Sequence, residues 1–164
     1  MGRWWNLVDT QDLKSCGHCD REGSIPSRPT NIKQKKMKHN VKIVTLSNLS
    51  ESTAQEVFNH VAKHLLNQME KSRAEKGGSC LYLQENGNKC AAGSLITAEE
   101  FVKYNIKDVN NSPWCTVVGV CNLPDIHSIL ISDLQSVHDT SYPSEWQAKL
   151  NVVAKNHDLE IFEA

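Results

Sequence analysis

The sequence predicts an α+β domain in which three main helices pack on a small, mostly antiparallel sheet with a central hairpin. The hairpin is expected at Asn86-Gly87-Asn88, because asparagine and glycine accept the positive φ angles that a tight turn needs. Apolar and β-favouring residues flank this turn in two arms, residues 80–84 and 89–92. Helical periodicity lies on both sides of the arms, so the hairpin is the expected centre of the fold.

Three segments have the residue spacing of amphipathic helices. Residues 53–72 begin with a threonine and a glutamate at capping-box spacing, and their apolar residues recur at steps of three and four. In residues 122–138, Asn122 can cap a helix that has the same kind of apolar stripe. A last helix is expected from Ser144, and a short helix at residues 98–104 follows the hairpin. These segments supply the helices of the predicted fold.

Three further stretches are expected to be strands. Residues 41–45 place Val, Ile and Thr at every second position. The uncharged run Thr-Val-Val-Gly-Val within residues 114–121 is typical of a buried strand. Residues 159–162 can add a short terminal strand. Together with the hairpin, these stretches would form the sheet.

Composition and charge exclude two classes of partner. A chain of 164 residues is long enough for one domain with a real core. Residues 37–164 hold 11 Lys and Arg against 15 Asp and Glu, a formal charge of −4, whereas nucleic-acid affinity comes from clustered cations. No apolar run approaches the ~20 residues that span a bilayer, and the start lacks the apolar segment of a secretory signal. We therefore expect a cytoplasmic protein with no nucleic-acid or membrane partner and with six reduced cysteines.

Residues 1–31 have no hydrophobic period, and their codons can be written as an RNA gene. With suitable codons, residues 2–3 and 27–30 encode the two strands of an acceptor stem followed by ACC. Residues 23–26 can encode the T-loop signature, and residues 11–16 can encode a stem around a loop that displays TAA. This stretch resembles a leucine tRNA gene translated in frame.

The resemblance implies that residues 1–36 are a non-native leader, disordered, and that Met37 is the natural start of a single α+β domain over residues 37–164. Two alternatives stay open. The leader can be a true arm with a metal site at Cys16, His18 and Cys19, although three such close ligands need a distant fourth. It can also be a basic tail that binds nucleic acid.

Cys90 is the candidate catalytic nucleophile. It lies on a hairpin arm and is followed by Ala-Ala-Gly and a helix start, where backbone amides can lower a thiol pKa. His138 and His127 are the candidate bases, and His60 and His64 are the other imidazoles of the body. The alternative is that Cys80 and Cys90 are small buried hydrophobes.

No metal or other cofactor is expected. His60 and His64 are four residues apart on a helix, but the glutamate of the metalloprotease motif is absent. The cysteines of residues 37–164 lack the two-to-four-residue spacing of structural zinc sites. His138-Asp139 can be an acid–base pair, or it can be a helix end at which the histidine favours the dipole.

A wider pattern covers most of residues 37–164. It comprises Cys80-x-Tyr82, Gly87-x-Lys89-Cys90-Ala-Ala-Gly93-x-Leu95-Ile96 and Asp133-Leu134-Gln135-x-x-His138-Asp139, with the helix segment Gln55-Glu56-Val57-Phe58 before them. The pattern resembles a group of small uncharacterised proteins of tailed phages and prophages. The resemblance implies a genomic setting in a bacterial host cell and no mechanism.

Ligand-binding candidates are Tyr82, Lys89, Trp114 and Asp139. Three of them belong to this pattern, and Trp114 follows a loop where it can frame a pocket or anchor the core. The predicted function is that of a small accessory protein of a phage or prophage, which binds a host protein or a small ligand without catalysis. The alternative function is a thiol-dependent hydrolase or transferase that uses Cys90 with a histidine.

Overall fold

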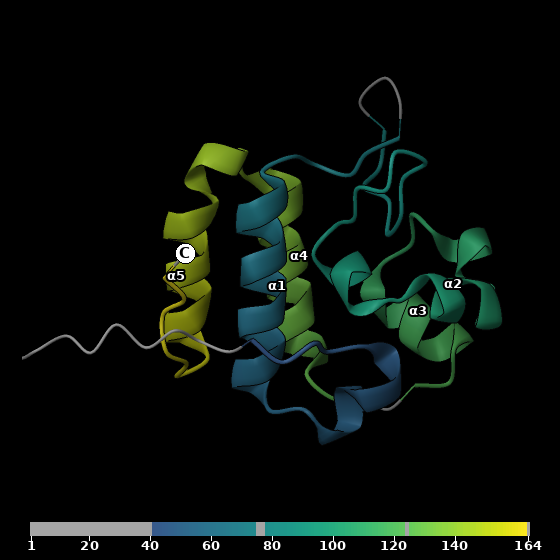
Figure 1. Cartoon of the computed structure of the whole chain (residues 1–164), viewed down its shortest axis with the longest axis horizontal. Coiled ribbons are helices and arrows are strands. Elements are labelled where there is room, and N and C mark those ends of the chain that lie inside the picture. Colours follow the sequence, from purple (N-terminus) through teal and green to yellow (C-terminus); the bar gives the residue numbers. More distant parts are fainter. Residues whose placement is uncertain (1–40, 75–77, 124, 164) are drawn as a thin grey trace, which may run out of the picture. The chain divides into compact units, whose positions relative to one another are not determined.

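The computed structural model describes residues 41–74, 78–123 and 125–163, and the predicted leader lies outside them. The described residues form five α-helices joined by short 3-10 turns (Figure 1). The α-helices are α1 (Ala54–Gln68), α2 (Ala98–Lys103), α3 (Trp114–Val120), α4 (Ser128–Thr140) and α5 (Trp146–Asn156). The 3-10 helices are η1 (Leu46–Glu51), η3 (Ala92–Leu95), η4 (Ile106–Val109) and η5 (Pro143–Glu145).

The predicted sheet is wrong, because the described part of the chain contains no strand and only one isolated antiparallel bridge, between Arg73 and Cys80. The turn at residues 86–88 does form, with Gly87 at φ 89° and the Gln84 amide donating to the Asn88 carbonyl. Its arms do not pair, and the part of the chain that the structure describes is helical rather than α+β.

The two arms are separated because their backbone groups bond elsewhere. The amide of Tyr82 donates to the Asn110 carbonyl, and the Asn110 side chain binds both the amide and the carbonyl of Leu83. On the other arm, the Lys89 amide donates to Gln68 Oε1 at the end of α1. Backbone and side-chain groups of Asn110 and Gln68 therefore replace the ladder that a hairpin would have supplied.

The predicted strand at residues 114–121 is also wrong, because these residues form α3. Pro113 stands at the N-cap, and the helix buries Trp114 and Val117 on one face. Burial at this three-residue spacing outweighs the β-propensity of the valines. The stretches 41–45 and 159–162 are not strands either. In the first of them, the Val44 amide donates to His60 Nδ1 rather than to a partner strand.

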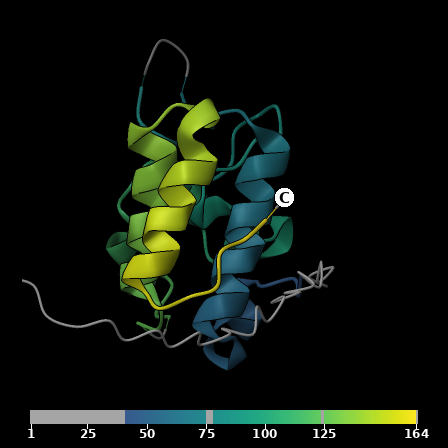
Figure 2. The same cartoon turned by 90° about the vertical axis from the view of Figure 1, so that its left-hand side faces the viewer.

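Helices α1, α4 and α5 pack against one another around the main core (Figures 1 and 2). The capping box predicted at Thr53 and Glu56 is confirmed and begins α1. By contrast, α4 begins at Ser128 rather than at residue 122, and α5 begins at Trp146 after a 3-10 turn. The largest fully buried side chains of these helices are Phe58, Leu65, Ile131, Leu134, His138, Trp146 and Leu150.

The short helix η3 contacts both α1 and α4. Its first two residues, Ala92 and Gly93, are small and buried, as is Ala91 just before it. A Cβ atom on Gly93 would lie 1.9 Å from the carbonyl oxygen of Tyr82, so only glycine permits this approach of two backbones. This contact fixes the segment around residues 80–83 beside η3, which itself contacts α4. None of the described helices has both the length and the apolar character needed to cross a membrane.

Candidate functional site

A cavity of about 860 Å³ opens between the exposed side of α4, the first residue of α3 and the segment around Cys80. Its floor is buried and consists of Tyr82, Cys90 and Trp114. Polar side chains line its walls and mouth, namely Arg73, Ser79, Cys80, Asn111, Ser112, Ser132, Gln135, Ser136, Asp139 and Thr140. The cavity therefore combines an apolar base with many hydrogen-bonding groups, which is the usual composition of a small-molecule site.

The fold brings together four of the residues predicted from sequence, since Cys90, Tyr82, Trp114 and Asp139 all line this cavity. His138 lies directly behind it and is bonded to Asp139. Lys89 and His127 lie elsewhere. Lys89 lines a second, smaller pocket, and the His127 ring nitrogen Nε2 is 2.7 Å from the Ser52 carbonyl at the other end of α4.

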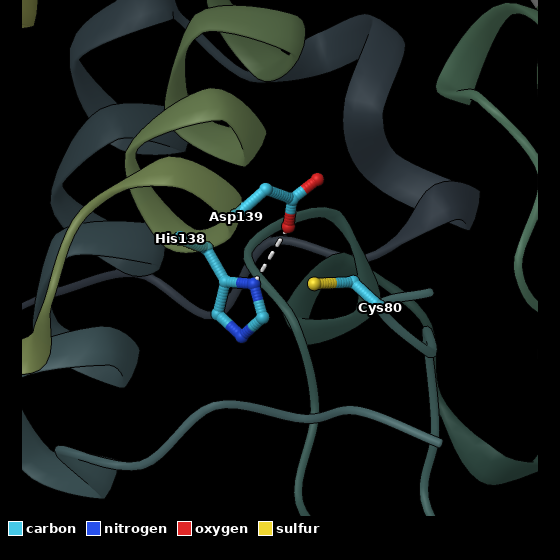
Figure 3. Close-up of side chains that lie close together, drawn as sticks. All are labelled: Cys80, His138 and Asp139. Atoms are coloured by element: carbon cyan, nitrogen blue, oxygen red, sulfur yellow. Dashed lines mark hydrogen bonds and ion pairs between the residues drawn. The ribbon is translucent and has the colours of Figure 1, made fainter. Parts of the chain in front are cut away.

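Cys80, His138 and Asp139 form a compact cluster at the cavity wall (Figure 3). One potential ligand atom from each residue lies within 4.8 Å of the others. Cys80 reaches the cluster from the segment that leads to Tyr82, whereas His138 and Asp139 are the neighbouring residues near the end of α4. The nitrogen Nδ1 of His138 is 2.9 Å from Oδ1 of Asp139.

The proton position on His138 follows from its second partner. The main-chain amide of Ser72 donates to His138 Nε2 at 3.1 Å, so Nε2 must be the unprotonated nitrogen. Nδ1 then carries the proton and donates it to Asp139. Because both ring nitrogens are engaged and the side chain is fully buried, His138 is not free to accept a proton from either cysteine.

Asp139 is the centre of the hydrogen-bond network. Its Oδ1 also accepts from Gln135 Nε2 at 2.6 Å, and the Gln135 Oε1 accepts from the Ala92 amide. Burial alone would raise the pKa of Asp139, but hydrogen bonds from His138, Cys80 and Gln135 hold it below the usual value for an aspartate. The carboxylate is therefore ionised at neutral pH and joins α4 to η3.

The main-chain carbonyl of Asp139 has two cationic partners. Lys71 Nζ and Arg73 Nη2 donate to it at 3.0 and 2.8 Å. These bonds satisfy a free carbonyl in the last turn of α4 and place positive charge at the negative end of the helix dipole. Arg73 is thereby held at the cavity wall beside Cys80.

Neither cavity thiol has the properties of a nucleophile. Burial, followed by the nearby carboxylate of Asp139, raises the pKa of Cys80 to about 12. Burial raises the pKa of Cys90 to about 12 as well, although the Gly93 amide donates to its sulfur at 3.3 Å. Only 2% of Cys90 is exposed. Both groups are therefore thiols at neutral pH, whereas nucleophilic attack requires a thiolate.

The hydrogen bonds of the cluster oppose metal binding. Zinc ligation by histidine requires a nitrogen lone pair directed at the ion, but the nitrogen that faces Asp139 is protonated as long as Ser72 occupies Nε2. The imidazole of His138 and the protonated thiol of Cys80 both donate to the carboxylate of Asp139, so the three groups satisfy one another's hydrogen bonds. We interpret the cluster as a hydrogen-bond network that fixes the cavity wall.

Alkylation of the full chain tests this account of the thiols. We expect iodoacetamide to modify the exposed Cys115 first among the cysteines of the described residues, and to modify Cys80 and Cys90 far more slowly. With pKa values raised this far, both cysteines stay almost entirely protonated at pH 8. Peptide mass spectrometry over a range of pH measures each rate. Rapid modification of Cys90 below neutral pH would contradict the burial argument.

Several members of the site were missed because their contacts join distant parts of the chain. Arg73 and Ser72 meet the end of α4 across 66 positions in the sequence, and no local pattern predicts such contacts. Gln135 was accessible to prediction, because Gln135, His138 and Asp139 have the spacing of one helix face. No known protein family, characterised protein or solved structure matches this chain.

Proposed function

We propose that this protein is a non-catalytic binding protein that holds a small polar molecule in the cavity beside α4. The observation that carries the proposal is the pairing of a buried apolar floor with walls that carry many polar side chains. The volume of about 860 Å³ lies within the range of ordinary ligand sites. A role as an accessory protein in the cytoplasm of a bacterial host agrees with the phage resemblance and belongs to the same proposal.

The ligand is expected to carry hydrogen-bond acceptors. Two N–H groups of lining residues, Nε of Arg73 and Nε1 of Trp114, are buried and have no acceptor among the described residues. Each such unpaired donor costs roughly 1–3 kcal/mol. Both atoms are closed off from solvent, so a ligand oxygen would bond to them only where binding shifts the side chains that cover them. The carboxylate of Asp139, 39% exposed on its side chain, offers a complementary site for a ligand donor.

A cavity-filling substitution on α4 tests the proposal. Ser136→Trp places a large ring at an exposed position on the cavity wall, whereas Ile129→Trp places it at a position of α4 that does not line the cavity. The probes are single amino acids, small carboxylic acids, amines and nucleosides, screened by thermal shift and ligand-observed NMR. At least one probe should stabilise the natural chain and the Ile129→Trp variant, and binding should weaken at least tenfold in Ser136→Trp.

Two results would overturn this proposal. One is that no probe class binds the natural chain. The other is that a probe binds the Ser136→Trp variant as tightly as the Ile129→Trp variant, which would place the bound molecule outside the cavity. Circular dichroism of both variants shows whether the fold is retained.

The alternative function, a thiol-dependent hydrolase or transferase, stays a prediction. Its nucleophile Cys90 shares a cavity with polar residues, which favours it. Three observations weigh against this function: Cys90 is buried, its pKa is raised, and both ring nitrogens of His138 are already hydrogen-bonded. The alkylation experiment separates the two functions, because an enzyme of this kind needs a Cys90 that reacts near neutral pH.

A further inference from the structure

A second pocket, of about 290 Å³, lies on the face of α1 that carries His60, Lys63, His64 and Asn67. These four residues have the i, i+3, i+4, i+7 spacing that aligns side chains on one helix face. Val41 and Ile43 line the pocket from the segment before η1, and Lys89 and Ser94 line it from the segment around η3. Every ionisable residue that lines the pocket is a base.

The lysine cations of this pocket lack carboxylate partners. Among the residues that the structure describes, neither Lys63 nor Lys89 forms an ion pair with a carboxylate. The ammonium of Lys89 is half-buried and donates to the Ile96 carbonyl at 2.5 Å, and burial lowers its pKa. Glu99 and Glu100 act on Lys89 from outside the lining and favour its charged form.

The two histidines add donors and acceptors rather than charge. His60 Nδ1 accepts from the Val44 amide, so its Nε2–H donates to the Ser94 carbonyl at 3.0 Å. His64 Nε2 is 3.1 Å from the Lys89 carbonyl, which favours the same tautomer and leaves Nδ1 without a partner among the described residues. Burial lowers the pKa of both rings, and the nearby Lys89 lowers it further. These groups therefore disfavour positive charge on one another until an anion is present.

We propose that this pocket binds a small oxyanion of the phosphate class between Lys63 and Lys89. Both ammonium groups can donate to its oxygens, and Asn67 supplies a neutral donor on the same helix face. The unpaired His64 Nδ1 can accept a hydrogen bond from the hydroxyl of a hydrogen phosphate. The volume leaves room for a phosphate group with a small organic substituent. This site is separate from the cavity beside α4 and does not depend on the function proposed for that cavity.

Titration of the full chain with inorganic phosphate at constant ionic strength tests the proposal. Amide NMR signals of residues 60–67 and 89–94 should shift and saturate. Lys63→Gln removes one cation from an exposed position of α1, and Lys107→Gln removes one from an exposed position of η4 outside the pocket. We expect Lys63→Gln to weaken phosphate binding about tenfold, the effect of one charge-assisted hydrogen bond, and Lys107→Gln to leave it unchanged.

Shifts that rise linearly with phosphate and never saturate would overturn the site. Equal weakening in Lys63→Gln and Lys107→Gln would also overturn it, because the interaction would then be general charge attraction. Both lysines are exposed, so neither variant should lose its fold, and thermal melting without phosphate checks this.

Discussion

Replacing His138 with alanine is expected to lower the free energy of unfolding by about 3–5 kcal/mol. The side chain is fully buried, and its ring stacks on Trp146 with the centroids 5.6 Å apart. Its removal opens a cavity between α4 and α5 and leaves the Ser72 amide without its acceptor. Asp139 loses a donor at the same time. Urea unfolding followed by circular dichroism measures the loss, which is a large part of the ~5–15 kcal/mol typical of a whole domain.

His157→Ala is the matched control for this substitution. His157 also donates to a carboxylate, Asp133, at 2.8 Å, but its side chain is 21% exposed and that of Asp133 is 48% exposed. Exposed pairs contribute less than about 1 kcal/mol. If His138→Ala and His157→Ala lowered stability equally, the buried network would not have the importance that we assign to it. His138→Asn should lie between the two, because an asparagine can keep the donor to Asp139 but not the acceptor for Ser72.

Helix α1 could be predicted from sequence because its signals are local. The capping box at Thr53 and Glu56 and the apolar spacing that follows act within a few residues, and both operate in the structure. The turn at Gly87 is local in the same sense and also forms. The end of the helix was predicted less well, because the pattern extends to residue 72 whereas α1 ends at Gln68, with Met69 in a left-handed conformation.

The sheet could not be predicted correctly because hairpin formation depends on competition for backbone bonds. In this chain, Asn110 and Gln68 take the backbone groups that the two arms would exchange. Both residues are at least 21 positions from their partners. The valines of α3 show the same limit, since their β-propensity is outweighed by the burial of Trp114 and Val117.

Some of the residues that line the cavity could be singled out from sequence, but their chemical state could not. The floor and wall residues Tyr82, Cys90 and Asp139 stood in one recognisable pattern, and the fold does place them in one cavity. Sequence could not show that burial and a neighbouring carboxylate make the thiols poor nucleophiles, because those effects arise from three-dimensional neighbours. The chemistry of the site is therefore set by the environment more than by the residue types.

Gly93→Ala is expected to destabilise the protein by about 3 kcal/mol or more. The new Cβ would lie 1.9 Å from the carbonyl oxygen of Tyr82 and 2.7 Å from its carbonyl carbon, and these are backbone atoms that cannot rotate away. Tyr82 is itself held, because its hydroxyl donates to the Ser112 carbonyl and its amide to the Asn110 carbonyl. Relief of the overlap must therefore move η3 from α4 or displace the cavity floor. Chemical unfolding measures the loss of stability, and weaker ligand binding would accompany it.

Gly119→Ala separates this overlap from the general effect of replacing glycine. Gly119 lies in α3, and nothing stands within 4 Å of the position of its Cβ. Alanine has the higher helix propensity, so this variant should be stabilised by about 0.5 kcal/mol or be unchanged. Opposite signs for the two glycines would show that close backbone contact, rather than backbone freedom, requires glycine at position 93. A stable Gly93→Ala protein would mean that the segment around residues 80–83 does not lie against η3, and the cavity beside α4 would lose its floor.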